Sequence, residues 1–438
     1  MAACLCALGS LLVLAPALLG ARSTLSFHPA HPSYPAPWAQ PAGDPPGINP
    51  ITSDIDFFVL PGLLRLRQLD AGGHGPWWDP NQLLGMPLGA NLPFPFLDPL
   101  TWPFDGVAAI GALDGLLWFH TALAAWLAWR AVRWMGGSHV AGALAAVGFA
   151  LSAWMTTRWH LPQIAWTTAY WPGLVTAVQR LRHGQHARGV AEGAVWVGLG
   201  LVSGFPQAGV LFGLGFAGLV LADPSLRRPR ALLSVAAVGV LGLVMAAPQL
   251  QALASVHAGS ARNEPASREA TAALGLAPGA LWGAVLPGFF GWPPDFATAD
   301  APAPRMADGL TQRMFLDDDV QENPVENALD PGVLVLLLGL LALRSGGDPR
   351  ARQLAALAVA AVAVALVWPL AVEHIPALSA AGTSNVKRVL VLTAGSLPLA
   401  AALELDAVRR RGAGRGVWIV GSLLAVVILA AVAVVARS

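Results

Sequence analysis

The chain has 438 residues, of which 55% are hydrophobic and only 12% are charged, against roughly 25% charged residues in a typical soluble domain. The mean hydropathy is +0.58. So few charges do not cover a soluble surface, so the composition excludes a string of soluble domains and indicates an integral membrane protein. The formal net charge is +1, and the lack of a long basic run argues against nucleic acid as a partner.

Eleven segments are apolar enough to predict membrane-spanning helices, since a helix needs about 20 residues to cross a bilayer. The eighth is short, and Pro172 and several glycines interrupt the fourth and fifth. The first has a second interpretation, a cleaved signal peptide, although it lacks the basic residues that begin one. The predicted spans are 3–21, 107–129, 138–156, 163–179, 189–203, 208–222, 231–248, 331–343, 353–372, 389–405 and 417–436.

The basic residues predict the orientation, because cytoplasmic loops carry an excess of Lys and Arg. With the N-terminus in the cytoplasm, five short cytoplasmic loops hold 15 of the 26 basic residues, and the whole cytoplasmic side holds only 5 of the 25 acidic ones. The C-terminus then lies outside. We therefore expect a multi-pass protein of a bacterial inner (plasma) membrane. The clustered residues are Arg130, Arg133, Arg180, Arg182, Arg188, Arg227, Arg228, Arg230, Arg344, Arg350, Arg352, Arg409, Arg410, Arg411 and Arg415.

Two long loops then face outward, at residues 22–106 and 249–330, and both are rich in Pro, Gly and Trp. Long ordered loops of this kind commonly carry function. In the first, an amphipathic stretch from Ser53 to Leu69 predicts a juxtamembrane helix in the membrane interface. Asp54 and Asp56 stand at its start, where partial desolvation would make a carboxylate a better base. The alternative is that they only stabilise a helix N-terminus.

The order of several weak motifs carries a family resemblance. The first loop has Asp54 seven residues before Pro61, the turn Trp78-Asp79-Pro80, the stretch 85–91 that ends in Ala-Asn, and the pair Phe94-Pro95. His160 then precedes Ala165-Trp166 and Trp171-Pro172. Later motifs are Gly204-Phe205-Pro206-Gln207, Ala247-Pro248-Gln249, Ser260-Ala261-Arg262 and, at the start of the tenth span, Arg388. Together they resemble the YfhO-like bacterial membrane proteins, which belong to the GT-C-type glycosyltransferases.

The resemblance implies a GT-C-like fold and a sugar donor carried on a polyprenyl phosphate, with the chemistry on the outer membrane face. The acceptor would be a glycan, a lipid or a protein. The family's catalytic acid lies in the first outer loop, where Asp54 matches best and Asp56 is the alternate. Residues 1–410 would form the GT-C-like transmembrane module, and 411–438 a cytoplasmic turn and a last transmembrane helix. The chain is shorter than most of the family, and it lacks their extra spans and C-terminal outer domain.

The chemistry of such a transfer needs one base and a set of cations. A phosphate leaves as a stable anion, so one carboxylate that deprotonates the acceptor is enough, unlike the paired carboxylates of most glycoside hydrolases. Cations or oriented donors must hold the leaving phosphate. The expected substrate-binding residues on the outer side are Arg158, His160, Gln207, Gln249, Arg262, Lys387 and Arg388. The alternatives are snorkelling to lipid headgroups for the cations and satisfied backbone groups for the glutamines.

A different class of function is a transporter or flippase for a lipid-linked saccharide. Asp114 lies well inside the second span, and an acid there usually faces a partner or a cavity. The acidic run 317–319 supplies oxygen ligands suited to a divalent metal cofactor, or else is a solvated loop. The glycines Gly213, Gly215 and Gly218 fit a dinucleotide-binding pattern only as text, because they lie in a predicted span with no strand before them. Close helix packing explains them better.

Overall fold

The computed structural model describes residues 59–73, 77–80, 85, 97–107, 109–159, 161–257, 267–285, 329–344, 347–375, 377–378, 385–411 and 422. Every regular element in these ranges is a helix. The first predicted span, nearly all of the last one and most of the second outer loop lie outside the described residues.

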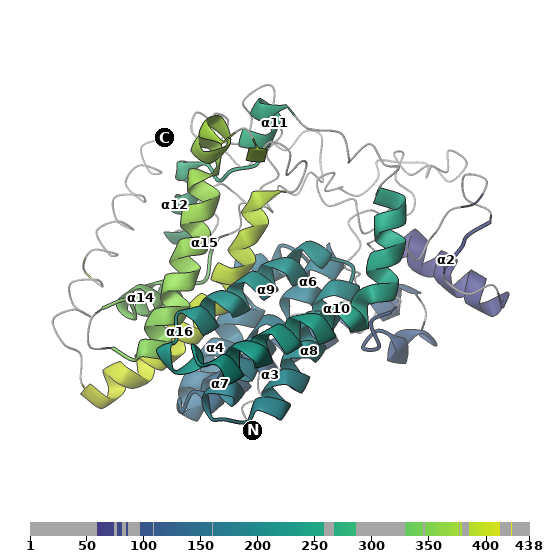
Figure 1. Cartoon of the computed structure of the whole chain (residues 1–438). Helices are drawn as coiled ribbons and strands as arrows, with labels where there is room; N and C mark the ends of the chain where they lie inside the picture. Colours follow the sequence, from purple (N-terminus) through teal and green to yellow (C-terminus); the bar gives the residue numbers. More distant parts are fainter. Residues whose placement is uncertain are drawn as a thin grey trace, which may run out of the picture.

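The helices are labelled in chain order in Figure 1. Their bounds are α2 Leu60–Ala71, η5 Trp102–Phe104, α3 Ala109–Trp134, α4 His139–Ala150, α5 Ala153–Thr156, α6 Pro162–Thr168, α7 Trp171–Arg182, α8 His186–Val202, α9 Pro206–Leu221, η6 Pro224–Leu226, α10 Pro229–His257, α11 Arg268–Ala272, η8 Pro278–Ala280, α12 Leu281–Val285, α14 Val333–Leu341, α15 Pro349–His374, η10 Val386–Leu390 and α16 Val391–Arg411.

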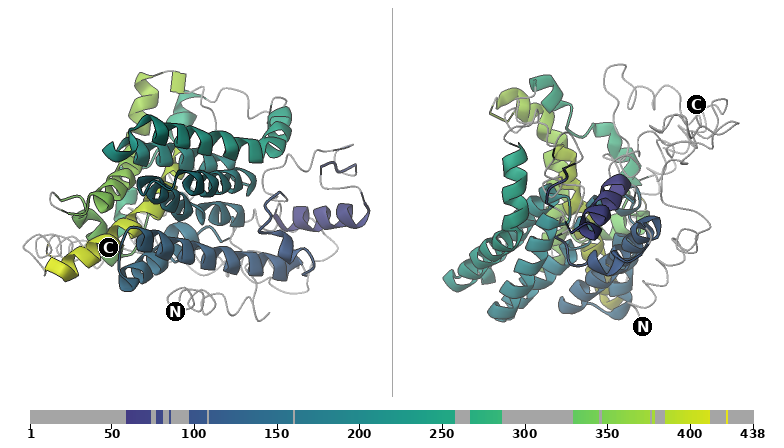
Figure 2. Two further views of the ribbon diagram at one scale, coloured as in Figure 1. Left: turned by 60° about the horizontal axis from the view of Figure 1, so that its bottom comes forward. Right: turned by 90° about the vertical axis from the view of Figure 1, so that its right-hand side faces the viewer.

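The helices pack in a row with one helix inside. α10 packs on α8, α8 on α7 and α9, α7 on α3, and α3 on α4. α16 crosses behind this row and contacts α4, α14 and α15 (Figure 2). α2 lies at the end of the bundle where α3 begins. The row and the inner helix together enclose the main hydrophobic core.

Four of the described helical stretches are long and apolar enough to cross a membrane. They are His139–Thr156, Pro229–Val256, Pro349–His374 and Val386–Arg411. The prediction of a helical membrane protein therefore holds in its general form. α14 has nine residues, and at about 1.5 Å per residue it is too short to span a bilayer alone. The count of eleven spans stays a prediction.

The predicted span 163–179 is two helices in the structure. α6 ends at Thr168, and α7 begins at Trp171 with Pro172 in its first turn. Proline has no backbone N–H and its ring crowds the preceding turn, so it is tolerated at a helix start and ends a helix that precedes it. The stretch His139–Thr156 consists of α4 and the short α5, and Ser152 between them caps α5 by accepting a hydrogen bond from the Met155 N–H.

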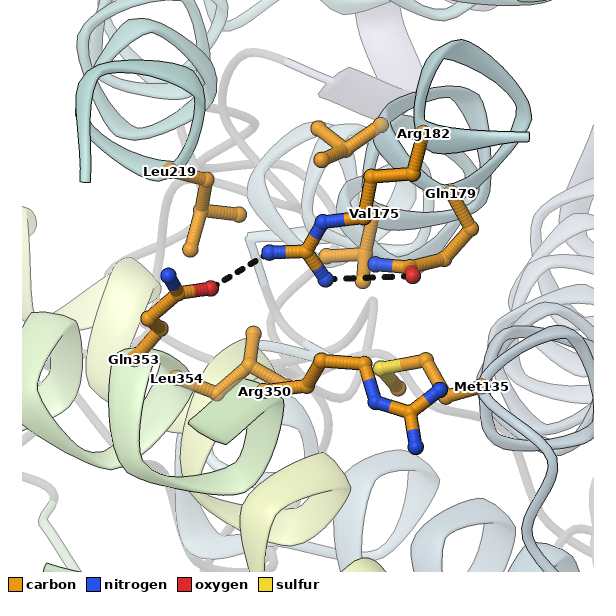
Figure 3. Close-up of a pocket in the computed structure, with 9 residues that line it drawn as sticks. Met135, Val175, Gln179, Arg182, Leu219, Arg350, Gln353 and Leu354 are labelled. Atoms are coloured by element: carbon orange, nitrogen blue, oxygen red, sulfur yellow. Dashed lines mark hydrogen bonds between the residues drawn. The ribbon is translucent and has the colours of Figure 1, made fainter. Parts of the chain in front are cut away.

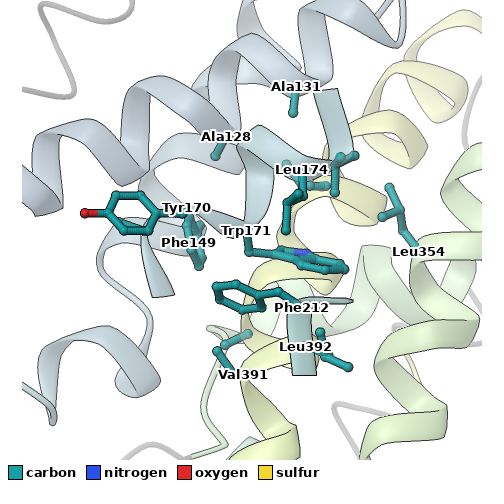
Figure 4. Close-up of a cluster of buried hydrophobic side chains, with 14 of the residues drawn as sticks. Ala128, Ala131, Phe149, Tyr170, Trp171, Leu174, Phe212, Leu354, Val391 and Leu392 are labelled. Atoms are coloured by element: carbon teal, nitrogen blue, oxygen red, sulfur yellow. The ribbon is translucent and has the colours of Figure 1, made fainter. Parts of the chain in front are cut away.

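The core centres on Trp171, the first residue of α7 (Figure 4). Its side chain is fully buried, and its indole N–H donates to the Ser396 hydroxyl of α16 at 3.1 Å. The ring of Phe212 from α9 lies 5.5 Å away between centroids. Gly215 and Gly395 lie directly against the Trp171 ring. Glycines therefore let α7, α9 and α16 approach one another closely, as expected for packed membrane helices.

The clustered basic residues meet the few acids that share their side in the predicted topology. Glu192 pairs with Arg130 at 2.6 Å and with Arg180, and Arg344 pairs with Glu404 at 2.6 Å. Arg350 pairs with Asp348 at 2.7 Å. A fourth acid, Asp406, accepts from the Ser138 hydroxyl at 2.6 Å. Glu192, Glu404 and Asp406 therefore join helices to other parts of the chain, whereas Asp348 pairs within the start of α15.

The ion pair between Arg182 and Asp223 lies where α7, the α9–η6 connection and α15 meet. Arg182 at the end of α7 pairs with Asp223, between α9 and η6, and also hydrogen-bonds to Gln353 of α15. Gln179 accepts from the same guanidinium at 3.1 Å. Arg182, Gln179 and Gln353 line a small cavity together with Met135, which follows α3, and apolar residues of α7, α9 and α15 (Figure 3). Arg182 thus fixes the relative positions of three helices.

We expect Asp223→Asn to weaken this junction. Burial raises the pKa of Asp223, but hydrogen bonds from Ser225 and the charge of Arg182 lower it more, so its pKa lies below the ordinary value. The carboxylate therefore stabilises the fold above the unfolded pKa near 4, and this stability is lost as the pH falls through the lower folded pKa. Unfolding at neutral pH should show a loss of about 1–3 kcal/mol in the variant.

The matched control is Glu269→Gln, because Glu269 is an exposed acid in the first turn of α11. It should leave the thermal unfolding midpoint at neutral pH unchanged. As the pH falls through the lowered folded pKa of Asp223, the parent protein should lose its advantage in stability over Asp223→Asn. An Asp223→Asn protein as stable as the parent at neutral pH would contradict the anchoring role.

Candidate functional site

Four of the predicted site residues lie outside the described residues: Asp54, Asp56, His160 and Arg262. In the first outer loop, the residues that the structure describes begin at Val59, which is buried. Val59 packs with Leu113 and Leu116 of α3 and with Trp166 of α6. The chain that follows the predicted acids in sequence is therefore held against α3 and α6.

The helix predicted in the first outer loop is present as α2, and two arginines tie it to the rest of the loop. Arg65 donates to both carboxylate oxygens of Asp79, at 2.7 and 2.6 Å. Arg67 donates to the backbone carbonyls of Phe104, at 2.8 Å, and of Val107. Asp79, from the Trp-Asp-Pro motif, is fully buried by this pairing. That motif therefore has a structural part, which is to hold α2 beside the start of α3.

A second acid of the first outer loop is the hub of a buried polar group. Asp98 accepts from the Tyr170 hydroxyl at 2.7 Å and from the Ser203 hydroxyl at 2.6 Å. His120 Nε2 lies 3.2 Å from the Tyr170 hydroxyl, and its Nδ1 lies 2.9 Å from the Leu116 carbonyl. All four side chains are at most 1% exposed. We call Asp98, His120, Tyr170 and Ser203 the Asp98 cluster.

Aromatic rings fix the members of the Asp98 cluster. The His120 ring stacks on Trp166, with centroids 5.4 Å apart, and Tyr170 stacks on Trp196 at 5.5 Å. The Asp98 backbone carbonyl accepts from the Thr101 hydroxyl, and one carboxylate oxygen accepts from the Leu100 N–H. Four separate parts of the chain, namely the first outer loop, α3, the α6–α7 junction and the end of α8, therefore meet here.

The sequence pointed only to His120 of this cluster, as a neighbour of Asp114 in the second predicted span, and not to Asp98, Tyr170 or Ser203. Asp98 precedes Pro99 and forms a turn with Leu100 and Thr101, a pattern that by itself indicates only a loop. The usable signal was indirect: Asp98 belongs to an outer loop expected to carry function, and His120 is one of only ten histidines in a very apolar chain. Their meeting with Tyr170 and Ser203 depends on tertiary packing across more than 100 residues of sequence.

Two predicted residues do come together at the start of α9. The Arg388 guanidinium donates to the side-chain carbonyl of Gln207 at 3.0 Å, and the Gln207 amide donates to the Asn385 backbone carbonyl at 3.1 Å. The guanidinium also lies over the Phe205 ring, 5.1 Å from its centroid. Lys387 precedes Arg388 in η10 and is buried. We call Phe205, Gln207, Lys387 and Arg388 the Arg388 cluster.

A single turn connects the two clusters. Ser203 follows the last residue of α8 and belongs to the Asp98 cluster, whereas Phe205 and Gln207 open α9 and belong to the Arg388 cluster. Gly204 between them has φ +88°, a conformation that glycine adopts without steric cost. The five residues from Ser203 to Gln207 therefore contact both the buried Asp98 carboxyl group and the Arg388 guanidinium.

The remaining predicted residues lie on neighbouring elements. Arg158 follows α5 and is fully buried, with its guanidinium 3.3 Å from the centroid of the Trp154 ring. Gln249 follows Pro248 inside α10 and is buried. Asp114 is buried on α3. Within the described ranges no group of three or more His, Cys, Asp or Glu is arranged to hold a metal ion, and the acidic run 317–319 lies outside them.

No family model matches the chain, and neither a curated protein nor a solved structure matches it. The fold alone therefore defines the class: a helical protein whose described part has four helices able to cross a membrane.

Proposed function

We propose that the protein is a membrane glycosyltransferase of the GT-C type, which moves a sugar from a polyprenyl-phosphate donor to a glycan, lipid or protein acceptor. The proposal keeps eleven spans, an inner-membrane location and a site on the outer face. The observation that carries it is the Arg388 cluster, in which Gln207 holds the Arg388 guanidinium at 3.0 Å with the buried Lys387 beside it in sequence. Such cations are what a leaving phosphate needs.

In the proposed reaction, Asp54 takes the proton of the acceptor hydroxyl, with Asp56 as the alternate. The acceptor oxygen forms a bond to the anomeric carbon while the bond to the phosphate oxygen breaks, so the configuration inverts. Arg388 and Lys387 stabilise the phosphate that leaves. Gln207 holds the Arg388 guanidinium in place through the hydrogen bond at 3.0 Å. Arg158, His160, Gln249 and Arg262 remain candidates for binding other parts of the donor.

A second candidate function is a transporter or flippase for a lipid-linked saccharide. It is favoured by the number of titratable side chains inside the bundle: Asp114 and His120 on α3, and Asp98 against them. Ionisable groups among membrane helices are costly, and they commonly mark the path of an ion or a substrate. The transferase also gives a role to the Arg388 guanidinium that Gln207 holds, so we prefer it.

Mass spectrometry of surface glycopolymers and polyprenyl lipids tests the proposal in cells that lack the gene. A polyprenyl-phosphate sugar should accumulate, and one glycan modification should disappear. Restoring the gene with Arg388→Ala should leave the rate of transfer about 10²–10³-fold below that of the parent, because one donor that stabilises the developing anion is lost.

Arg227→Ala is the matched control for Arg388→Ala. Arg227 follows η6 in one of the arginine-rich loops, and its guanidinium donates to the Leu221 carbonyl. This variant should restore both the glycan and the lipid profile. Unchanged glycans and lipids in cells without the gene would contradict both proposed functions. Accumulation of a sugar lipid with a normal Arg388→Ala phenotype would contradict the role of Arg388 alone.

A further inference from the structure

Three consecutive hydrogen bonds run through the Asp98 cluster. They join the Leu116 carbonyl to His120 Nδ1 at 2.9 Å, His120 Nε2 to the Tyr170 hydroxyl at 3.2 Å, and that hydroxyl to Asp98 Oδ2 at 2.7 Å. A hydrogen bond requires one hydrogen between its two heavy atoms. The row therefore requires three.

His120 Nδ1 and the Tyr170 hydroxyl supply two of these three hydrogens, and the source of the third must be assigned. The Leu116 carbonyl only accepts, so Nδ1 of His120 must carry a hydrogen. Tyr170 supplies a second, which goes either to Asp98 or to His120 Nε2, but not to both. The third must come from a protonated Asp98 or from a doubly protonated His120. An ionised Asp98 beside a neutral His120 would leave two acceptors facing each other.

We propose that Asp98 and His120 form a proton-binding site that holds one proton between them, with the Tyr170 hydroxyl as the bridge. In one state Asp98 is a neutral carboxylic acid and donates to Tyr170, which donates to His120. In the other state His120 is an imidazolium and donates to Tyr170, which donates to an ionised Asp98. The proton and the two hydrogen bonds reverse together, so no atom must leave its place.

Burial separates the Asp98 cluster from solvent. All members of the Asp98 cluster are at most 1% exposed, so solvent does not replace a missing hydrogen, and an unsatisfied polar atom here costs about 1–3 kcal/mol. The elements around the site also carry other charged side chains. They include Asp114, Arg130 and Arg133 of α3, Arg65 and Arg67 of α2, Arg180 and Arg182 of α7, Arg188 and Glu192 of α8, Arg158 after α5 and Arg388 of η10. Ser203 links the Asp98 carboxyl to the turn that leads to Arg388.

The site therefore takes a proton as its ligand. With one proton bound, the Asp98–His120 pair carries no net charge in either state, so the proton moves between the two groups without placing an isolated charge in the bundle. This inference depends on the hydrogen bonds alone and holds for either proposed function.

Two spectroscopic measurements on the full-length protein in lipid nanodiscs test the site at neutral pH. Infrared spectroscopy detects the carbonyl stretch of a protonated carboxylic acid, and ¹⁵N NMR of labelled histidine distinguishes neutral from doubly protonated imidazole. The infrared band should be lost in Asp98→Asn, and His120→Gln identifies the His120 signals. We expect the protonated fraction of Asp98 and the doubly protonated fraction of His120 to sum to one.

Two variants serve as controls. Asp79 is as buried as Asp98 but is paired with Arg65, so Asp79→Asn should leave the infrared band unchanged. His374 makes the same Nδ1 contact to the carbonyl four residues before it, at 2.8 Å, but is exposed. His374→Gln should leave the signals of His120 unchanged. If Asp98→Asn does not fold, ¹³C NMR of the parent protein labelled at aspartate reports the same fraction.

A sum near zero, with Asp98 ionised and His120 neutral in the same sample, would overturn the proposal. A sum near two would also overturn it, because the site would then hold two protons. Activity of the protein does not enter either measurement, so failure of the proposed transferase function leaves this test intact.

Discussion

Asp54→Asn should abolish sugar transfer while the protein stays folded. Transfer from a polyprenyl phosphate needs a base for the acceptor proton, and an amide cannot accept that proton. The substitution keeps the size of the side chain, so the loss would be chemical. The measurement is the incorporation of a labelled sugar by membranes that contain equal amounts of the parent protein and the variant.

Asp114→Asn is the informative comparison. Asp114 is buried on α3, so a transporter that uses an intramembrane acid would depend on it. The transferase proposal expects sugar incorporation to survive Asp114→Asn and to fail with Asp54→Asn. The reverse pattern, with a dispensable Asp54, would favour the transporter. If neither substitution changes the glycan profile, both functions are wrong.

Gly215→Ala should destabilise the bundle by about 1–3 kcal/mol, the usual cost of adding a methyl group to a well-packed core. A Cβ at Gly215 would lie 2.6 Å from the Trp171 ring and 2.8 Å from Leu392. Trp171 has no room to yield, because its indole N–H is bonded to Ser396 and its other side lies against Gly395. Thermal unfolding in detergent measures the effect.

The other two glycines of the same pattern are the controls. A Cβ at Gly213 or Gly218 meets nothing within 4 Å. Gly213→Ala and Gly218→Ala should therefore keep or slightly raise the unfolding midpoint, because alanine favours a helix by up to about 1 kcal/mol over glycine. Equal destabilisation by all three substitutions would show that the Trp171 contact is not the cause.

The sequence predicted where helices lie better than where a helix is interrupted. Apolar segments located the helices, because burial in a membrane or a core leaves a direct mark on composition. The division of 163–179 was harder to predict. Pro172 was visible, but proline permits either a kinked helix or a new one, and the surrounding packing decides between them.

The sequence predicted members of the candidate site only where the position of a single residue was informative by itself. Gln207 and Arg388 were chosen singly, for their position at expected outer helix ends, and they hydrogen-bond to each other. The Asp98 cluster had no such local signal. Asp98, His120, Tyr170 and Ser203 are each ordinary in sequence, and their chemistry arises from complete burial and contact between four parts of the chain.

The unequal burial of the long helices has a consequence for tolerance to substitution. Of the most apolar window of each helix, 94% of the residues are buried inside the protein for Val386–Arg411, against 28% for Pro229–Val256 and 28% for Pro349–His374. Lipid accepts almost any apolar side chain, whereas a packed interior accepts few shapes. Exchanging Leu, Val and Ile freely should therefore be harmless on the exposed faces of α10 and α15, while α16 should resist nearly every exchange.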